Sequence, residues 1–259
     1  MKIIVCIKQV PDTTEIKLNP ETGTMIRDGV PSIMNPDDKG GLEMALNLKD
    51  QFGAHVTVIT MGPAQADQIL REAYAMGADR AIHLTDKRFA GADTLATSNA
   101  LAGALRMLEY DLIITGRQAI DGDTAQVGPQ IAELLDLPQV TYVEDLQFAN
   151  DTFTIKKANE EGYQIVQVET PCLITVLASA NEPRYMSVNG IMTAYQKEVE
   201  VWGFDNISVD ETKLGLKGSP TRVFKSFSKG AKSVGQKYEV DPKMAVEIIM
   251  EKLKEKFII

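Results

Sequence analysis

The sequence predicts an α/β fold, in which a mostly parallel sheet is flanked by helices on both faces and continues into an antiparallel extension and a C-terminal arm. Short runs of β-branched residues alternate with helical patterns over the first two thirds of the 259 residues. Such alternation is typical of a parallel sheet covered by helices. After Val143 the pattern changes to consecutive strand-like runs, and beyond Tyr195 it becomes irregular.

Five apolar runs predict the strands of the parallel sheet because each is short and rich in β-branched residues. They are Lys2–Ile7, His55–Met61, Ala81–Leu84, Leu112–Thr115 and Val140–Val143. Helical patterns fill the intervals between them. One starts at Asn35, with Leu42, Ala45, Leu46 and Phe52 expected to face inward, and the others carry Ile69 to Met76, Thr94–Leu108 and Pro129–Leu135.

The ends of these helices carry recognisable capping residues. Asn35-Pro36-Asp37-Asp38 supplies a capping amide, a proline in the first turn and acids at the positive end of the helix dipole. Gly77 stands where a helix end favours a left-handed residue. Asp241-Pro242 predicts the start of a terminal helix with Ala245, Ile248, Ile249 and Phe257.

The remaining segments predict two additions to the parallel sheet. Glu15–Leu18 and Met25–Arg27 indicate a surface hairpin. An antiparallel extension is expected from Leu146–Phe148, Phe153–Lys157, Tyr163–Glu169 and Cys172–Leu177. Because a long irregular stretch is unusual inside a compact domain, we divide the chain into a domain of residues 1–195 and an arm with a terminal helix, 196–259, that wraps a partner.

Composition excludes several classes of function. The formal charge is −9 and the pI is about 4.9, which argues against a nucleic-acid or anionic-membrane surface. Two cysteines and two histidines are too few for a soft-ligand metal cluster, and neither His55 nor His83 makes a convincing general base, so we expect no metal and no catalytic residue. The first strand begins at Lys2 and no apolar run has membrane-spanning length, so we expect a cytoplasmic protein without membrane insertion.

The segment from Gly116 to Pro129 contains the strongest candidate binding loop. It follows a predicted strand and precedes a helix, at the carboxyl edge where α/β sheets bind ligands. Backbone N–H groups of a glycine-rich turn and a helix N-terminus favour an anion. Thr124, Gln126 and Arg117 would add contacts to a diphosphate, whereas Asp121 and Asp123 suit hydroxyl or backbone donors. The alternative is an ordinary polar connection.

Other strand ends would lie on the same edge of the sheet. They are Cys6 to Pro11, Met61-Gly62-Pro63 and the turn Asn35-Pro36-Asp37-Asp38. Each alone is more often structural than functional, and their convergence favours a binding site. The sequence contains neither G-x-G-x-x-G nor G-x-x-x-x-G-K-[ST], so a standard dinucleotide fingerprint and a P-loop are both absent from it.

Four motifs in order resemble the beta subunit of electron-transferring flavoproteins. They are Met61-Gly62-Pro63-Ala64-Gln65, Ala75 to Arg80, Gly116-Arg117-Gln118-Ala119-Ile120-Asp121, and Asn181-Glu182-Pro183-Arg184-Tyr185. The resemblance runs from Lys2 to about Lys197. It implies a Rossmann-like, adenine-nucleotide-binding fold and a heterodimer with a larger alpha subunit that holds an FAD. The beta subunit of this family binds AMP or the ADP part of a second FAD.

The resemblance also assigns residues to roles. The implied nucleotide contacts are Cys6, Asn35, Pro36, Asp37, Asp38, Met61, Gly116, Arg117, Gln118, Ala119, Ile120, Asp121, Gly122, Asp123, Thr124, Ala125, Gln126 and Val127. Residues 181–197 resemble a loop that docks onto acyl-CoA dehydrogenases, with Glu182, Arg184, Tyr185 and Val188 as contacts. Val188 stands where family members often carry a leucine.

The loop resembles that of the electron-bifurcating branch of the family, because Gly122 replaces an acid that single-electron carriers commonly have there. In that branch the beta subunit holds a full FAD that NADH reduces. One electron then goes to a low-potential carrier, ferredoxin or flavodoxin, and one passes through the alpha flavin to a dehydrogenase. Two alternatives stay open: a single-electron carrier with structural AMP, and a stand-alone adenine-nucleotide-binding regulatory or hydrolase domain.

Overall fold

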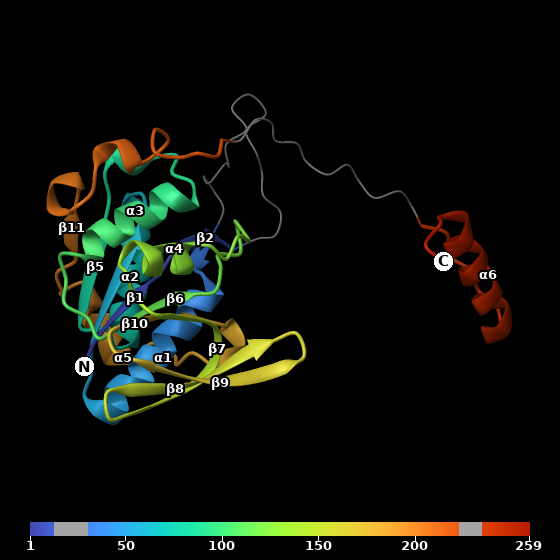
Figure 1. Cartoon of the computed structure of the whole chain (residues 1–259), viewed down its shortest axis with the longest axis horizontal. Helices are drawn as coiled ribbons and strands as arrows, with labels where there is room; N and C mark the ends of the chain where they lie inside the picture. Colours follow the sequence, from blue (N-terminus) through green and yellow to red (C-terminus); the bar gives the residue numbers. More distant parts are fainter. Residues whose placement is uncertain (13–30, 223–234) are drawn as a thin grey trace. The chain divides into compact units, whose positions relative to one another are not determined.

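The computed structural model describes residues 1–12, 31–222 and 235–259 and divides the chain into two units, Met1–Lys225 and Ser226–Ile259 (Figure 1). The first unit contains a nine-stranded sheet in the order β11-β5-β4-β1-β6-β10-β7-β8-β9. Its strands are β1 (Lys2–Cys6), β4 (His55–Met61), β5 (Arg80–Leu84), β6 (Leu112–Gly116), β7 (Gln139–Ala149), β8 (Thr152–Asn159), β9 (Gly162–Glu169), β10 (Cys172–Val176) and β11 (Glu200–Trp202). Pairing is parallel from β11 to β7 and antiparallel from β7 to β9, which confirms the predicted fold class.

Helices cover both faces of the sheet. The alternation of side chains along β1 sends Ile3 and Val5 to one core and Ile4 to the other. The first core also contains residues of α1 (Pro36–Phe52), α2 (Asp67–Met76) and α5 (Val188–Ala194), and the second those of α3 (Thr94–Leu105) and α4 (Val127–Leu134). The main strands are therefore buried on both faces, as parallel sheets require.

Short elements complete the first unit. A two-stranded antiparallel sheet joins β2 (Gln9–Pro11) to β3 (Ser32–Met34) directly after β1. Single 3₁₀ turns are η1 (Ala64–Ala66), η2 (Lys87–Phe89), η3 (Ala178–Ala180), η4 (Phe204–Asn206) and η5 (Glu211–Lys213). The predicted hairpin of Glu15–Leu18 and Met25–Arg27 lies outside the described residues.

The predicted antiparallel role of Cys172–Leu177 is wrong. The segment forms β10, which lies between β6 and β7 and pairs parallel with both. All five of its residues are buried. A strand covered by helices on both faces needs a continuous apolar run, whereas a half-exposed extension strand alternates. β8, with its alternating burial, shows the second pattern.

Two smaller predictions about the helices also differ from the structure. Phe52 does not face inward: its side chain is 47% exposed and meets the edge of Phe148 at 5.7 Å between ring centroids. Helix α3 ends at Leu105 rather than Leu108. The predicted left-handed end after α2 is confirmed, since Gly77 has a φ of 130°.

Part of the segment beyond residue 195 packs on the sheet. β11 pairs parallel with β5, and Leu214 is buried in the core beneath α3. The structure accordingly groups these residues with the first unit, which extends to Lys225. The functional division after residue 195 stays a prediction.

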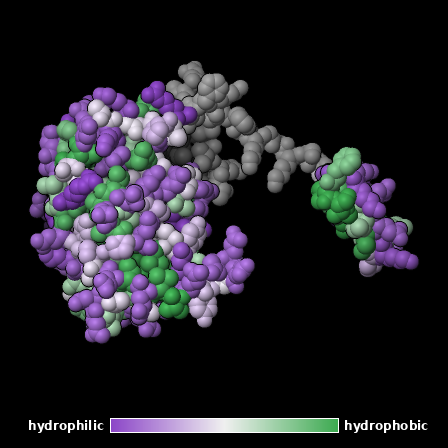
Figure 2. Space-filling model, viewed as in Figure 1, coloured by the Kyte–Doolittle hydropathy of each residue, from purple (hydrophilic) through white to green (hydrophobic). Residues whose placement is uncertain are grey.

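The second unit contains α6 (Pro242–Glu255), which starts at the predicted residues. The Asp241 carboxylate accepts hydrogen bonds from the backbone N–H groups of Lys243 and Met244. Apolar residues gather on one side of this helix (Figure 2), with Val246, Ile249 and Met250 all exposed. Among the described helices, none combines the length and apolar character needed to cross a membrane.

The contact between α5 and α2 yields a prediction about stability. A Cβ added at Gly190 would overlap the backbone carbonyl oxygen of Ala75 and lie 2.7 Å from Ser187 Oγ. Gly190→Ala should therefore lower the free energy of unfolding by roughly 1–3 kcal/mol, a usual cost of overpacking. Urea denaturation would measure the loss. The control is Gly122→Ala, because an added Cβ at Gly122 meets no atom within 4 Å, so this variant should be neutral. Gly162→Ser is not a suitable control, because Gly162 has a positive φ at which a side chain adds strain of its own. Equal stability of Gly190→Ala and Gly122→Ala would contradict the close contact between α5 and α2.

Candidate functional site

A cavity of about 680 Å³ opens at the carboxyl ends of β1, β4, β5 and β6. Successive strands are added on one side of β1 as far as β5, and the chain then crosses to the other side to form β6. Such a reversal leaves a crevice between the loops that follow the strands, which is where α/β folds bind ligands. The volume lies in the range of small-molecule sites, ~300–1,000 Å³.

One wall of the cavity is the loop between β6 and α4. The lining residues of this loop are Gly116, Arg117, Gln118, Ala119, Gly122, Thr124, Ala125, Gln126, Val127 and Gly128. Asp123 and Ala125 have positive φ angles of 50° and 52°, which non-glycine residues rarely adopt. Such strain is common where a loop shapes a functional site. The N-terminus of α4 opens toward the same space.

The opposite wall is the segment between β5 and α3, which the sequence analysis did not assign. Residues 84–94 line it almost continuously, together with Thr97. Asp93 caps α3 by accepting a hydrogen bond from Ala96 N at 3.0 Å. Thr94 Oγ1 lies 2.9 Å from Gln126 Oε1 and joins the two walls. The Asp93 carboxylate already caps α3, so the N-terminus of α4, which has no side-chain cap, is the one that favours an anion in the cavity.

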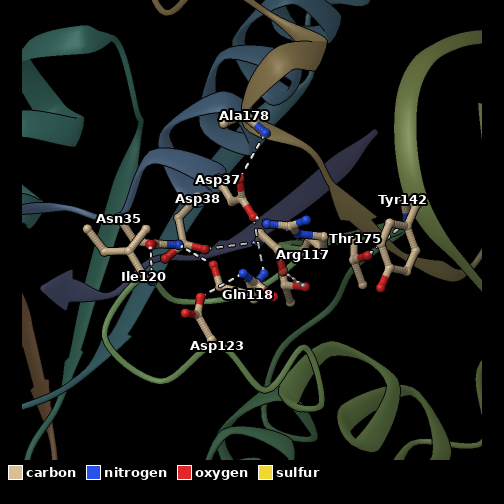
Figure 3. A network of polar contacts seen from close by, with 12 residues as sticks. Asn35, Asp37, Asp38, Arg117, Gln118, Ile120, Asp123, Tyr142, Thr175 and Ala178 are labelled. Atoms are coloured by element: carbon tan, nitrogen blue, oxygen red, sulfur yellow. Dashed lines mark hydrogen bonds and ion pairs between the residues drawn. The ribbon is translucent and has the colours of Figure 1, made fainter. Parts of the chain in front are cut away.

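Three polar residues at the start of α1, which we call the strand-end clamp (Asn35, Asp37 and Asp38), hold the loops in place (Figure 3). The Asp38 carboxylate accepts hydrogen bonds from Lys8 N at 2.8 Å and Gly116 N at 3.0 Å, which joins the ends of β1 and β6. Asp37 accepts hydrogen bonds from Ala178 N at 2.9 Å and Gln118 N at 3.3 Å, which adds the segment after β10.

The Asn35 side chain bonds to the loop instead of capping the backbone of its own helix. Its side chain makes no capping hydrogen bond to α1, so the predicted capping amide is wrong. Instead, Nδ2 donates to the carbonyl oxygen of Gln118 at 2.8 Å, and Oδ1 accepts from Ile120 N at 3.1 Å. Because Asn35 is fully buried, its amide acts as a fixed internal tie between helix and loop.

Burial shifts two titrating groups at the floor of the cavity. Desolvation raises the pKa of Asp38 to about 7, although the hydrogen bonds from Asn35, Lys8 and Gly116 oppose the shift. Desolvation also raises the pKa of the Cys6 thiol to about 12. Cys6 is therefore a neutral thiol and not a nucleophile. His83 is buried in β5 with Nε2 3.1 Å from the Gly62 carbonyl oxygen.

The predicted nucleotide contacts divide into two groups in the structure. Twelve line the cavity: Cys6, Asp38, Met61, Gly116, Arg117, Gln118, Ala119, Gly122, Thr124, Ala125, Gln126 and Val127. The other six, Asn35, Pro36, Asp37, Ile120, Asp121 and Asp123, are not part of this lining. Asp121 pairs with Lys8 Nζ at 2.6 Å, and Asp123 accepts from Gln118 Nε2 at 2.7 Å. Their contact with a ligand stays a prediction.

Residues 84–94 could have been found from the sequence by one signal. They follow a predicted strand that ends on the same edge, and Asp93-Thr94 is a capping pair at the start of a helix. The run Ala90-Gly91-Ala92 carries no polar side chain, and it therefore has the composition of an ordinary connection.

The segment predicted to dock onto a dehydrogenase presents apolar side chains to solvent. Tyr185 is 97% exposed and Val188 is 77% exposed, and Glu182 is also exposed. Arg184 turns inward instead: its guanidinium contacts Glu43 at 3.0 Å and Asp50 at 2.9 Å on α1. This ion pair anchors the segment, and the role of these residues toward a partner stays a prediction.

The strand-end clamp makes Gly116 hard to replace. A Cβ at this position would overlap Asp38 Oδ1 and lie 2.8 Å from Asp37 Cβ. Gly116→Ala should therefore lower the free energy of unfolding by about 2 kcal/mol, because two buried carboxylates must shift. Gly122→Ala in the same loop is the matched control, with an expected change of less than about 0.5 kcal/mol. Chemical denaturation that shows similar stability for both variants would mean that Gly116 is not held by the clamp.

Comparison with known proteins shows the family of the chain. The family model described as the electron transfer flavoprotein domain matches residues 22–206. The electron transfer flavoprotein subunit beta of Clostridium acetobutylicum is 57% identical over 255 residues, covering 98% of both chains. The caffeyl-CoA reductase-Etf complex subunit CarD of Acetobacterium woodii is 51% identical over 262 residues, covering 100% of both.

A third relative carries a different name. The acryloyl-CoA reductase electron transfer subunit gamma of Anaerotignum propionicum is 46% identical over 268 residues, again covering 100% of both chains. Identity at this level over the full length implies the same fold in each protein. The chain therefore belongs to the electron transfer flavoprotein family and is of its beta-subunit type.

Proposed function

We propose that this chain is the beta subunit of a heterodimeric electron transfer flavoprotein and that its cavity binds FAD. The observation that carries the proposal is the cavity itself, which extends from the glycine-rich loop across to the N-terminus of α3. The uncapped N-terminus of α4 and the backbone N–H groups of the glycine-rich loop suit a diphosphate on one wall, and the other wall adds Thr94 and Thr97 of α3. Membership of the family makes a flavin nucleotide the natural ligand.

The alternative ligand, AMP, would use only part of this space. A single phosphate needs only the N-terminus of α4, whereas the cavity lining extends beyond it to Thr94 and Thr97 of α3. Gly122 has no other atom within 4 Å of its would-be Cβ, so the loop leaves room beside it. Both features favour the larger diphosphate ligand.

When bound, FAD supplies both hydride and single-electron chemistry. The chain contributes binding, orientation and electrostatics. Lys8, Lys87 and Arg117 line the cavity, but Lys8 pairs with Asp121 and Arg117 with Asp37, so part of their charge is balanced within the protein. Burial raises the pKa of Asp38 to about 7, which also limits the negative charge beside a diphosphate.

In the full proposal NADH delivers a hydride to the beta-subunit site, and its two electrons then separate. One goes to ferredoxin or flavodoxin, and the other passes through the alpha-subunit FAD to an acyl-CoA dehydrogenase in the cytoplasm. The names of two relatives, a caffeyl-CoA reductase complex subunit and an acryloyl-CoA reductase electron transfer subunit, support a partner of this class. The single-electron carrier with AMP is the competing function.

The exposed apolar residues of α6 support the proposed alpha-subunit contact. Met244, Val246, Ile249 and Met250 are between 43% and 60% exposed. A helix with an apolar stripe gains stability only when that stripe is covered. We therefore assign residues 196–259, and α6 above all, to the contact with the alpha subunit.

The loop supplies the experiment that tests FAD binding. Gly122→Asp places a negative charge near the proposed diphosphate, and two like charges about 4 Å apart cost roughly 1–4 kcal/mol at surface dielectrics. That corresponds to roughly a fivefold to thousandfold loss of affinity. The variant heterodimer should therefore keep the alpha flavin and lose the beta flavin, as measured by flavin and AMP released per heterodimer.

Gly122→Ala is the control, because it adds a methyl group without charge where no atom lies within 4 Å. It should retain both flavins and normal reduction by NADH. Arg117→Ala should weaken flavin binding to a smaller degree than Gly122→Asp. A wild-type heterodimer that releases one FAD and one AMP would overturn the assignment of FAD and favour the single-electron carrier.

The exposed segment supplies a separate test of partner docking. Val188→Ala should slow electron delivery to the dehydrogenase several-fold, because a truncated exposed anchor buries less apolar surface at the interface. Reduction of the bound flavin by NADH should stay unchanged. Ile165→Ala on β9, where the side chain is 60% exposed, is the control and should change neither rate. Equal loss of both rates in Val188→Ala would place this residue elsewhere than at the docking surface.

A further inference from the structure

One face of α1 holds the start of the exposed segment 181–197. Glu43, Asn47 and Asp50 follow one another at spacings of four and three residues, so they share one side of the helix. All three contact Arg184, whose Nη2 atom lies 3.0 Å from Glu43 Oε1, 3.2 Å from Asn47 Oδ1 and 2.9 Å from Asp50 Oδ2. Arg184 is therefore fixed by a stripe of side chains and not by a single surface pair.

Glu43 is the buried member of this stripe. The residue is only 5% exposed, and its Oε2 atom accepts hydrogen bonds from Arg184 N at 2.9 Å and from Arg184 Nε at 3.0 Å. A buried carboxylate is tolerated only where its oxygens are paired, and this one is paired almost entirely by Arg184. Because both the backbone and the guanidinium of Arg184 donate to it, Glu43 fixes the path of the chain as well as the direction of the side chain.

Arg71 on α2 holds the other end of the segment. Its Nη1 atom donates to the carbonyl oxygens of Ala194 at 2.9 Å and Lys197 at 2.6 Å. Its Nε atom donates to Asp67 at 3.1 Å, and its guanidinium lies 5.4 Å from the centroid of the Tyr195 ring. A planar guanidinium with several donors can make these contacts at the same time.

The part of the segment between these two ends presents apolar side chains to solvent. Tyr185, Val188 and Met192 are all exposed. The backbone beneath them is held on α2, because Ser187 N donates to the carbonyl oxygen of Ala75 at 3.2 Å. An exposed apolar segment that is fixed at both ends and in the middle is already ordered before any partner binds.

We propose that Glu43 and Arg71 are positioning residues for electron delivery, which hold this segment in the conformation that a dehydrogenase binds. The inference rests on the proposed docking of residues 181–197 onto that partner. A segment that is ordered in the free protein loses little conformational freedom on docking, whereas a mobile one must be ordered at every encounter. Neither Glu43 nor Arg71 lines the cavity, so their effect falls on docking and not on the nucleotide site.

Glu43→Gln tests the first end, because it keeps the shape of the side chain and removes its charge. Electron delivery is measured to an acyl-CoA dehydrogenase, with the reduced heterodimer as the varied reactant and its concentration taken from bound flavin. The KM for the heterodimer should rise roughly 3- to 10-fold, because side chains of the segment must now be ordered on docking. The rate at saturating heterodimer should change by less than about twofold, and reduction by NADH should be unchanged.

This separation of KM from the maximal rate distinguishes positioning from a general loss of stability. Unfolded heterodimer has no bound flavin and is not counted, so instability alone would leave the KM unchanged. Glu72→Gln is the matched control: Glu72 forms an ion pair with Lys39 at 2.7 Å that also joins α2 to α1, but the pair includes no residue of the segment. Its KM should equal that of the wild type.

Arg71→Lys tests the other end, because it keeps the charge and loses the planar fork that reaches both carbonyl oxygens. Its KM should rise to a similar degree, and it decides the question if Glu43→Gln fails to assemble. An unchanged KM in either variant, beside a raised KM in Val188→Ala, would overturn the positioning role of that residue. An equal rise in Glu72→Gln would also overturn it. An unchanged KM in Val188→Ala would instead overturn the proposed docking surface itself.

Discussion

The fold brings the ends of three parallel strands to one place, and the strand-end clamp satisfies the backbone N–H groups that the sheet leaves unpaired there. Asp38 bonds to N–H groups after β1 and in β6, and Asp37 to one after β10. These bonds satisfy the backbone N–H groups without water. The cavity can therefore keep a fixed shape although irregular loops form most of its lining.

Burial of the Asp38 carboxyl carries an electrostatic cost, and the raised pKa that results lowers the negative charge at the site. Because the folded pKa of Asp38 is raised to about 7, the folded chain holds a proton that the unfolded chain releases at lower pH. The stability contributed by this group is greatest below the ordinary carboxyl pKa and declines as pH rises toward 7. The Asp38 carboxyl beside the loop is therefore only partly charged near neutral pH. A fully ionised pair, Asp37 and Asp38, would oppose a phosphate more strongly.

The sequence predicted what depends on local pattern, and it failed where distant residues decide. Apolar runs located the strands, and Asn35-Pro36 located the start of α1. The partners of the Asn35 side chain, Gln118 and Ile120, are 83 and 85 positions away, so its capping role could not be judged locally. The place of β10 in the sheet depends on which distant strands it pairs with, and a local pattern does not give that order. Its uninterrupted run of apolar residues nevertheless favoured a central strand. Residues 84–94 escaped notice because their role comes from the cavity and not from a motif.

Residues 84–94, the cavity wall that the sequence analysis did not assign, are also held by hydrogen bonds from the segment beyond residue 195. Asp86 accepts a hydrogen bond from Phe204 N at 3.1 Å, and Asp93 Oδ2 accepts bonds from Thr221 N and Oγ1 at 3.1 and 2.8 Å. Asp93 N in turn donates to Ser219 Oγ. The same Asp93 caps α3, whose first residue bonds to Gln126 across the cavity. The two walls are thus held by different parts of the chain, one by the start of α1 and the other by residues 203–221. A change in either support would reach the cavity through a single intervening layer of hydrogen bonds.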